Sequence, residues 1–206
     1  MDLESLTLPF VGGSATENRY LAYIFGAAVP DFSAGYYPQK LIEVNLLPTC
    51  QGLGNYAFYE CTRLVYLTVG EGLSSIGVRA FDGCERLRSL ALPSSLKSIG
   101  DNAFFGCLRL ESVTFGTPET SALSMIGINA FYDCISLRSI VLPNALTYLP
   151  ASCFADCAAL ASVDLGGVKT VGKNAFRNCG ALTEVIKHGD VTFEDGNEAA
   201  IKEETT

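Results

Sequence analysis

The chain has 206 residues, a formal net charge of −8 and a sequence pI near 4.6. This acidic balance argues against nucleic acid and anionic lipid as partners, because both require clustered Lys and Arg side chains. No stretch approaches the roughly 18 consecutive apolar residues of a membrane-spanning helix, and Met1-Asp-Leu-Glu lacks the features of a secretory signal. Either the protein is cytosolic or the sequence is a mature region cut from a longer precursor.

The chain begins with a segment that has the pattern of a short strand. Leu3-Glu-Ser-Leu-Thr-Leu-Pro9 matches the Leu-x-x-Leu-x-Leu-Pro pattern that ends each later repeat. Up to residue 40 this pattern is interrupted by turn signals and a short aromatic segment. We expect residues 1–40 to form a first strand and an irregular insertion that caps the end of a solenoid. The alternative is an aromatic ligand patch. Its candidate residues are Tyr20, Tyr23, Phe25, Tyr36 and Tyr37.

From residue 41 to residue 188 the sequence repeats with a period near 23 residues. The core of each copy is Ala-Phe-x-x-Cys-x-x-Leu, with Cys153 in place of the Ala in one copy. The Cys after each Phe stands at positions 61, 84, 107, 134, 157 and 179, in steps of 23, 23, 27, 23 and 22 residues. Such a fixed period indicates a solenoid of stacked coils. The longer step predicts a surface loop at residues 116–122 that leaves the register intact.

Each repeat is predicted to have three parts. A short β-leaning segment, such as residues 73–77, precedes a brief helical turn, and a strand such as residues 87–92 follows. In the turn, Ala80, Cys84 and Leu87 are spaced to share one helical face. A polar residue stands directly before the turn in four repeats, where an N-cap would accept hydrogen bonds from free backbone N–H groups. The residues expected in this role are Asn102, Asn129, Ser152 and Asn174.

Six of the eight cysteines occupy the same position in successive repeats, so their spacing follows the period and not a metal-site template. We expect a column of small buried side chains with unreacted thiols, and not disulfides or a metal site. Cys50 and Cys153 lie outside this column. Cys153 is four residues before Cys157, but it fills an Ala position, which favours packing as its role too.

The complete motif is Leu-x-x-Ile-Gly-x-x-Ala-Phe-x-x-Cys-x-x-Leu-x-x-Leu-x-Leu-Pro, seen most fully at residues 73–93. It resembles the BspA-like leucine-rich repeat, and the resemblance covers about residues 41–186. The resemblance implies an α/β repeat fold, a right-handed leucine-rich-repeat solenoid with a parallel β-sheet on one face and short helical turns on the other. It also implies a bacterial cell-surface or secreted setting, with roles in adhesion to host or microbial ligands.

The expected organisation therefore has three parts. Residues 1–40 hold the first strand and the capping insertion, and residues 41–188 hold the leucine-rich repeats. Residues 189–206 are acidic and polar and are expected to form a C-terminal tail or linker.

Residues that suggest catalysis are few. His188 is the only histidine and stands just beyond the last repeat strand, which favours a surface residue over a catalytic one. Asp133 and Asp156 occupy the same position in adjacent repeats and could form a carboxylate pair, but Asp at a turn is usually solvated. The sequence therefore predicts no enzyme, no cofactor and no metal site.

The outward positions of the strands form the better candidate surface. Strand alternation puts Leu90 and Leu92 inward and leaves Ser89 and Ala91 outward. Across the repeats, the outward positions carry short hydroxyls, a few acids and one Tyr, which predict a flat hydrogen-bonding face. The alternative is that β-formers such as Thr are there for sheet propensity. The candidate ligand-binding residues are Glu43, Asn45, Tyr66, Thr68, Ser89, Ser112, Thr114, Ser139, Ser162, Asp164 and Glu184. The same two rows also contain Ser5, Thr7, Ala91, Val141 and Ile186.

These features predict a non-enzymatic module that binds a protein or a glycan, through the sheet face or through the aromatic insertion. The alternative is a structural spacer within a larger surface protein, with no ligand of its own. We expect a monomer, with no nucleic-acid partner and no insertion into a membrane.

Overall fold

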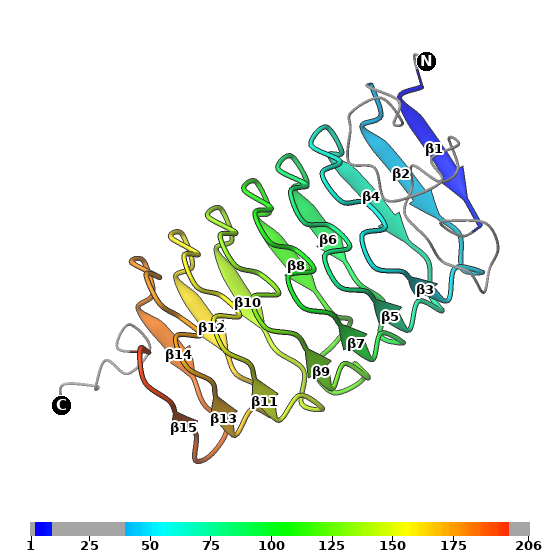
Figure 1. Cartoon of the computed structure of the whole chain (residues 1–206). Coiled ribbons are helices and arrows are strands. Elements are labelled where there is room, and N and C mark those ends of the chain that lie inside the picture. The colour runs from blue at the N-terminus through cyan, green and yellow to red at the C-terminus, as the bar shows by residue number, and fades with distance from the viewer. Residues whose placement is uncertain (1–2, 10–39, 198–206) are drawn as a thin grey trace.

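The computed structural model of the protein describes residues 3–9 and 40–197. The described chain forms a row of stacked coils in which every paired strand is parallel to its neighbours (Figure 1). The solenoid predicted from the period is therefore confirmed. Each coil contributes one longer strand to one face and one two-residue strand to a second face.

The longer strands form a five-stranded sheet, β1-β2-β4-β6-β8, and a three-stranded sheet, β10-β12-β14. Their bounds are β1 Ser5–Leu8, β2 Glu43–Leu46, β4 Tyr66–Val69, β6 Ser89–Ala91, β8 Ser112–Thr114, β10 Ser139–Val141, β12 Ser162–Asp164 and β14 Glu184–Ile186. Leu6 of β1 lies opposite Val44 of β2, so the first predicted strand stacks directly on the next one although the insertion separates them in the sequence.

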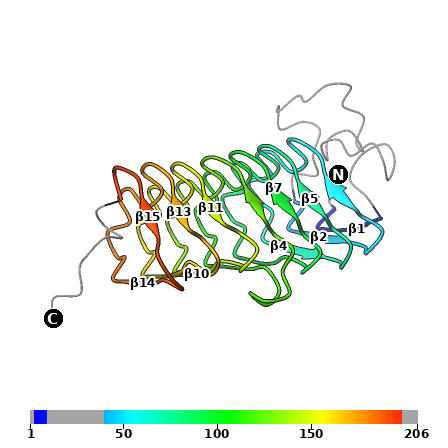
Figure 2. The same ribbon diagram turned by 90° about the horizontal axis from the view of Figure 1, so that it is seen from below.

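The two-residue strands form a four-stranded sheet, β3-β5-β7-β9, and a three-stranded sheet, β11-β13-β15. Their bounds are β3 Gly52–Leu53, β5 Ser75–Ile76, β7 Ser98–Ile99, β9 Met125–Ile126, β11 Tyr148–Leu149, β13 Thr170–Val171 and β15 Thr192–Phe193. Figure 2 shows this second row of strands running alongside the first.

The core between the faces is a set of columns, one side chain from each coil. Neighbouring rings of the phenylalanine column are stacked within 9° of parallel, with centroids 5.0–5.9 Å apart. The column consists of Phe58, Phe81, Phe104, Phe131, Phe154 and Phe176, and all six side chains are fully buried. Since no coil could bury its apolar side chains alone, this continuous core holds the coils together.

The predicted helical turns are wrong, because no described residue lies in a helix. In the turn after each two-residue strand, alternate N–H groups donate to the next coil and not to a carbonyl four residues earlier. The N–H of Phe81 donates to the carbonyl of Ala103 at 2.7 Å, and the N–H of Gly83 donates to that of Phe105 at 2.9 Å. These bonds between coils use the donors that a helix would need.

The residue before each Ala-Phe pair is also not an N-cap. Asn102 has a φ of 55°, and Asn129, Ser152 and Asn174 have φ between 53° and 59°. These values are in the left-handed region, which Asn tolerates better than most residues. The residue before each column Cys is left-handed as well; it is Gly in two consecutive coils (Gly83 and Gly106) and an acidic residue or Asn in the others.

The extra four residues form a loop at 116–122 that stands out from the row of coils (Figure 2). Within the loop, the carbonyl of Pro118 accepts a hydrogen bond from the N–H of Asn144 at 3.0 Å. The hydrogen-bond ladder of each face is interrupted at this point, between β8 and β10 and between β9 and β11. Nevertheless Phe104 and Phe131, on either side, stack at 5.0 Å, so the loop leaves the core register intact.

Of the C-terminal tail predicted for residues 189–206, residues 189–197 continue the solenoid, and residues 198–206 lie outside the described residues. β15 pairs with β13, and the side chain of Asn197 is fully buried. In the earlier coils, the N–H of the column Phe donates to a backbone carbonyl of the next coil. At Phe176 the N–H donates instead to Oδ1 of Asn197 at 3.1 Å. Nδ2 of Asn197 donates to the carbonyls of Gly172 and Glu194 at 3.0 and 2.7 Å.

Candidate functional site

The sheet face carries the predicted outward residues in two straight rows. In the first row, Ser5 lies opposite Glu43, which lies opposite Tyr66, and the register continues through Ser89 and Ser112. After the loop it resumes through Ser139, Ser162 and Glu184. The second row is parallel to it and contains Thr7, Asn45, Thr68, Ala91, Thr114, Val141, Asp164 and Ile186. The strand register thus brings the predicted residues together on one surface. Whether they bind a ligand stays a prediction.

Tyr66 is the most prominent side chain of this face, with 57% of its surface exposed. It borders a shallow hollow of about 300 Å³ over β4 and β6. The hollow exists because the side chains of Ser89 and Ala91, on the neighbouring strand, are much smaller than that of Tyr66. An exposed ring beside a hollow lined by hydroxyls offers both apolar contact and hydrogen bonds to a ligand.

A second hollow, of about 290 Å³, lies over β8 and β10, where the loop at 116–122 meets the sheet. Thr114, Ser139 and Val141 form its floor, and Thr117 and Pro118 of the loop form a wall. Val141 is half exposed here, so the hollow presents apolar as well as polar surface. The loop that the long period predicted therefore shapes the candidate surface.

The charged residues of the sheet face are partly engaged with one another. Nε2 of His188 lies 2.8 Å from Oδ1 of Asp164, which also accepts a hydrogen bond from the N–H of Gly166 at 2.9 Å. His188 is exposed, as the sequence predicted. At the other end of the face, Nδ2 of Asn45 lies 3.4 Å from Oε1 of Glu43. Between these ends the face is largely uncharged.

The cysteine column is buried from Cys84 to Cys179, and its first member, Cys61, is half-buried. Cys84, Cys107, Cys134, Cys157 and Cys179 each donate a thiol hydrogen bond of 3.1–3.3 Å to the carbonyl of the column Phe in the preceding coil. All eight cysteines are free thiols. Among the described residues, no group of three or more His, Cys, Asp and Glu side chains is arranged to hold a metal ion.

Asp133 and Asp156 lie in adjacent coils but in different surroundings. Asp156 accepts hydrogen bonds from Nδ2 of Asn178 at 2.6 Å and from Nη2 of Arg177 at 3.0 Å. The Tyr132 hydroxyl, Asn178 and Arg177 together hold the pKa of Asp156 below its usual value, despite partial burial. Burial and the charge of Asp156 raise the pKa of Asp133. The Arg177 ion pair therefore makes Asp156 part of a surface network.

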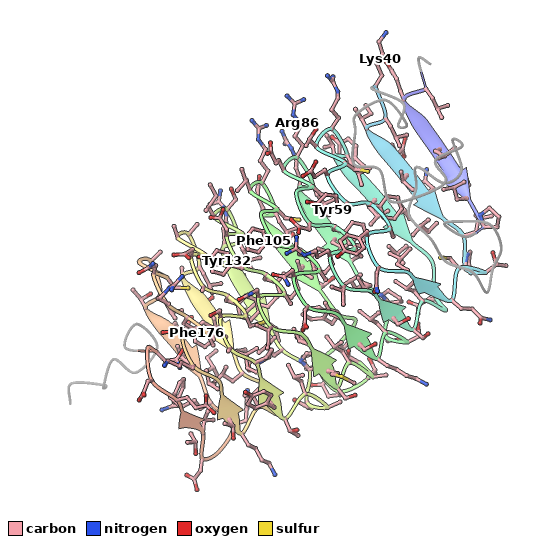
Figure 3. The ribbon with its side chains drawn as sticks, in the orientation of Figure 1. Lys40, Tyr59, Arg86, Phe105, Tyr132 and Phe176 are labelled. Carbon is pink, nitrogen blue, oxygen red and sulfur yellow. The ribbon has the colours of Figure 1, made fainter. Side chains whose placement is uncertain are left out.

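The aromatic patch predicted within residues 20–37 lies outside the described residues. A different aromatic group, which the sequence reasoning missed, lies on the turn side of the coils (Figure 3). There Phe105 stacks on Tyr132 with ring centroids 5.0 Å apart, and the guanidinium of Arg177 lies 5.9 Å from the Tyr132 centroid. All three follow the column Phe of their repeat, so aligning that position would have revealed them.

No helix in residues 3–9 and 40–197 has the length and apolar character needed to cross a membrane.

Comparison with known families finds a match to the BspA type leucine rich repeat region. Six copies match, over residues 33–122 and 118–195. These ranges include the whole of the Phe and Cys columns.

Solved structures of several bacterial proteins are similar to this chain. The T. pallidum leucine rich repeat protein is 35% identical, with a TM-score of 0.70, over 76% of this chain and 75% of that one. A leucine rich cell surface protein from Faecalibacterium prausnitzii is 19% identical, with a TM-score of 0.37, over 91% of this chain and 70% of that one. The pneumococcal vaccine antigen PcpA is 17% identical, with a TM-score of 0.47, over 90% and 61% of the two chains. A search of curated proteins found no match.

Proposed function

Because the chain belongs to the BspA-type leucine-rich repeat family, we propose that it is a non-enzymatic module that binds a protein or a glycan through its sheet face. Repeat solenoids offer long continuous surfaces, and they are commonly used for binding. Fold alone does not establish a function, so the proposal depends on the particular side chains of this face.

The observation that carries the proposal is the exposed Tyr66 beside its hollow, which the hydroxyl side chains of Thr68 and Ser89 also line. Exposed aromatic rings next to hollows are frequent centres of binding energy in interfaces. The hydroxyls around it can donate or accept hydrogen bonds, and they lose little conformational freedom when a ligand binds.

The setting that we propose is the surface of a bacterial cell or the medium around it, as the repeat family suggests, with adhesion as the role of the binding. The buried thiols are compatible with such a setting, because a thiol that stays protonated inside a core is protected from oxidation.

The experiment is a binding screen against immobilised extracellular-matrix proteins and glycans, followed by titration of each ligand that is captured. Tyr66→Ala is the test variant, and Tyr148→Ala is its matched control. Tyr148 is 48% exposed on β11, in the other set of strands, so both changes remove an exposed tyrosine from a strand. We expect Tyr66→Ala to weaken binding by about tenfold, and Tyr148→Ala to change it less than twofold.

Equal effects of the two substitutions would contradict the sheet face as the binding surface. Absence of saturable binding to every ligand would contradict a binding module and favour the spacer. Unfolding curves of both variants that overlap the wild-type curve would verify that the changes act on binding and not on folding.

A further inference from the structure

One edge of the solenoid carries a line of arginine side chains that the family motif does not require. Arg63, Arg86 and Arg109 occupy the same position in three consecutive coils, two residues after the column Cys. Lys40 stands at the equivalent position of the coil before them. In Figure 3, the labelled Lys40 and Arg86 project from the same edge, away from the core.

Two further arginines stand beside this line. Arg88 and Arg138 lie directly before the strands β6 and β10. Backbone hydrogen bonds from Arg109 to Glu85 and from Glu111 to Arg88 join the neighbouring coils along this edge. We call Arg63, Arg86, Arg88, Arg109 and Arg138 the arginine edge.

All five side chains of the arginine edge are exposed, and none has a side-chain ion pair or hydrogen bond with another described residue. Two acidic residues, Glu85 and Glu111, lie next to these arginines in the sequence. Five arginines and two glutamates give this edge a net charge of +3. The whole chain has a charge of −8. The arginine edge therefore has a net charge opposite in sign to that of the whole chain.

The spacing of the line is set by the stacking of the coils. The phenylalanine rings of the same three coils are 5.1 Å apart, and the arginine positions, one in each coil, follow the same stacking. A linear polysaccharide with one anionic group on every sugar residue carries a dense row of charges, so its groups can pair with arginines of successive coils.

The guanidinium group binds carboxylate and sulfate through paired, parallel hydrogen bonds. An anionic membrane or a nucleic-acid duplex is broader than this edge. Either partner would also contact the acidic surfaces beside the edge, and those surfaces would repel it. A narrow chain can contact the edge alone. We propose that the arginine edge binds a linear anionic polysaccharide with one carboxylate or sulfate in each sugar residue. This site uses a different surface from the sheet face, so it goes beyond the binding proposed above.

The test measures binding of the full chain to polygalacturonate, with its neutral methyl ester as the control ligand, and to dextran sulfate. The test variant combines Arg63→Gln, Arg86→Gln and Arg109→Gln. The control variant combines Lys97→Gln, Lys169→Gln and Lys173→Gln, which remove the same charge from exposed positions away from the edge. We expect the first variant to lose about tenfold or more in affinity for a charged polymer, the second less than threefold, and added salt to weaken wild-type binding.

Failure of both charged polymers to bind, equal losses in the two variants, or equal binding of the neutral ester would overturn the proposal. So would binding to phosphatidylserine vesicles in preference to both polymers. Tyr66→Ala should change polysaccharide affinity less than twofold, so failure at this edge is distinguishable from failure at the sheet face. All substituted residues are exposed, and a thermal melt of each variant checks that the coils remain folded.

Discussion

The thiol of Cys107 donates a hydrogen bond of 3.3 Å to the backbone carbonyl of Phe81 in the preceding coil. The same carbonyl accepts the N–H of Cys84 at 3.0 Å within its own coil. The carbonyl of Phe81 therefore accepts one hydrogen bond from its own turn and one from the next coil. The repetition of this arrangement along the solenoid explains why a small side chain with a donor recurs at that position.

The thiols of the folded protein should be unreactive. Burial raises the pKa of Cys61 and of Cys179 to about 12, and it raises those of the other column cysteines as well. Because only the thiolate reacts, we expect less than one equivalent of the eight thiols to react with a disulfide reagent within minutes at pH 8, and all eight in denaturant. Ser124→Cys places a thiol at an exposed position and should add one fast equivalent. Several fast equivalents in the unmodified protein would contradict the buried column.

The phenylalanine column should dominate stability, and two adjacent residues allow a direct comparison. Phe104 is fully buried between Phe81 and Phe131, whereas Phe105 is partly exposed and stacks on Tyr132. We expect Phe104→Ala to lower the free energy of unfolding by about 3–5 kcal/mol, and Phe105→Ala by about 1 kcal/mol. Urea denaturation followed by circular dichroism measures both. Similar losses of unfolding free energy in the two variants would mean that the buried phenylalanine column does not dominate stability.

The left-handed backbone at Asn102 predicts an order of stability among substitutions. Asn102→Ala places a Cβ where the φ of 55° disfavours it, which should cost about 1–2 kcal/mol. Asn102→Gly loses the same side-chain contact with Asn129 but has no Cβ, so it should cost less. The difference between the denaturation midpoints isolates the backbone conformation. Equal stability of the Asn102→Ala and Asn102→Gly variants would contradict a left-handed backbone at this position.

Asp82 should make stability depend on pH. Burial raises its pKa to about 6, although the Arg79 guanidinium at 3.2 Å acts in the opposite direction. In the unfolded chain an aspartate has a pKa near 3.9. Between about pH 4 and pH 6 the unfolded state therefore binds fewer protons than the folded state, and stability falls as the pH rises through this window. The free energy of unfolding should fall by about 2–3 kcal/mol in total across this window.

Asp82→Asn should flatten this part of the profile of unfolding free energy against pH. Glu85→Gln removes an exposed carboxylate from the same coil and serves as the control. A wild-type profile that rises between pH 4 and pH 6, or one that both substitutions flatten equally, would contradict the role of Asp82.

The columns and the outward rows could be predicted from the sequence because both repeat with the period. Phe81 and Phe104 are 23 residues apart, and stacking of identical coils is enough to place them in contact. The turns could not be predicted in the same way. Ala80, Cys84 and Leu87 have helical spacing, but the partners of the turn's N–H groups lie a full coil away, and a pattern of apolar residues carries no information about the sign of φ.

The arginine edge was missed for a different reason. A net charge summed over the chain averages Arg63 and Arg86 with distant carboxylates, whereas the coils bring these two residues next to one another. An alignment of the repeats that compared charged as well as apolar positions would have found the line. Aligning the repeats on the column Cys is enough to place Arg63, Arg86 and Arg109 at one position.

Asn197 bears on how such arrays could be lengthened. Its amide supplies the acceptor that the backbone of another coil supplies elsewhere, so one side chain substitutes for a neighbouring repeat. A designer who inserts additional 23-residue units before residue 189 should therefore retain residues 189–197, since without Asn197 the N–H of the last column Phe would be buried without an acceptor.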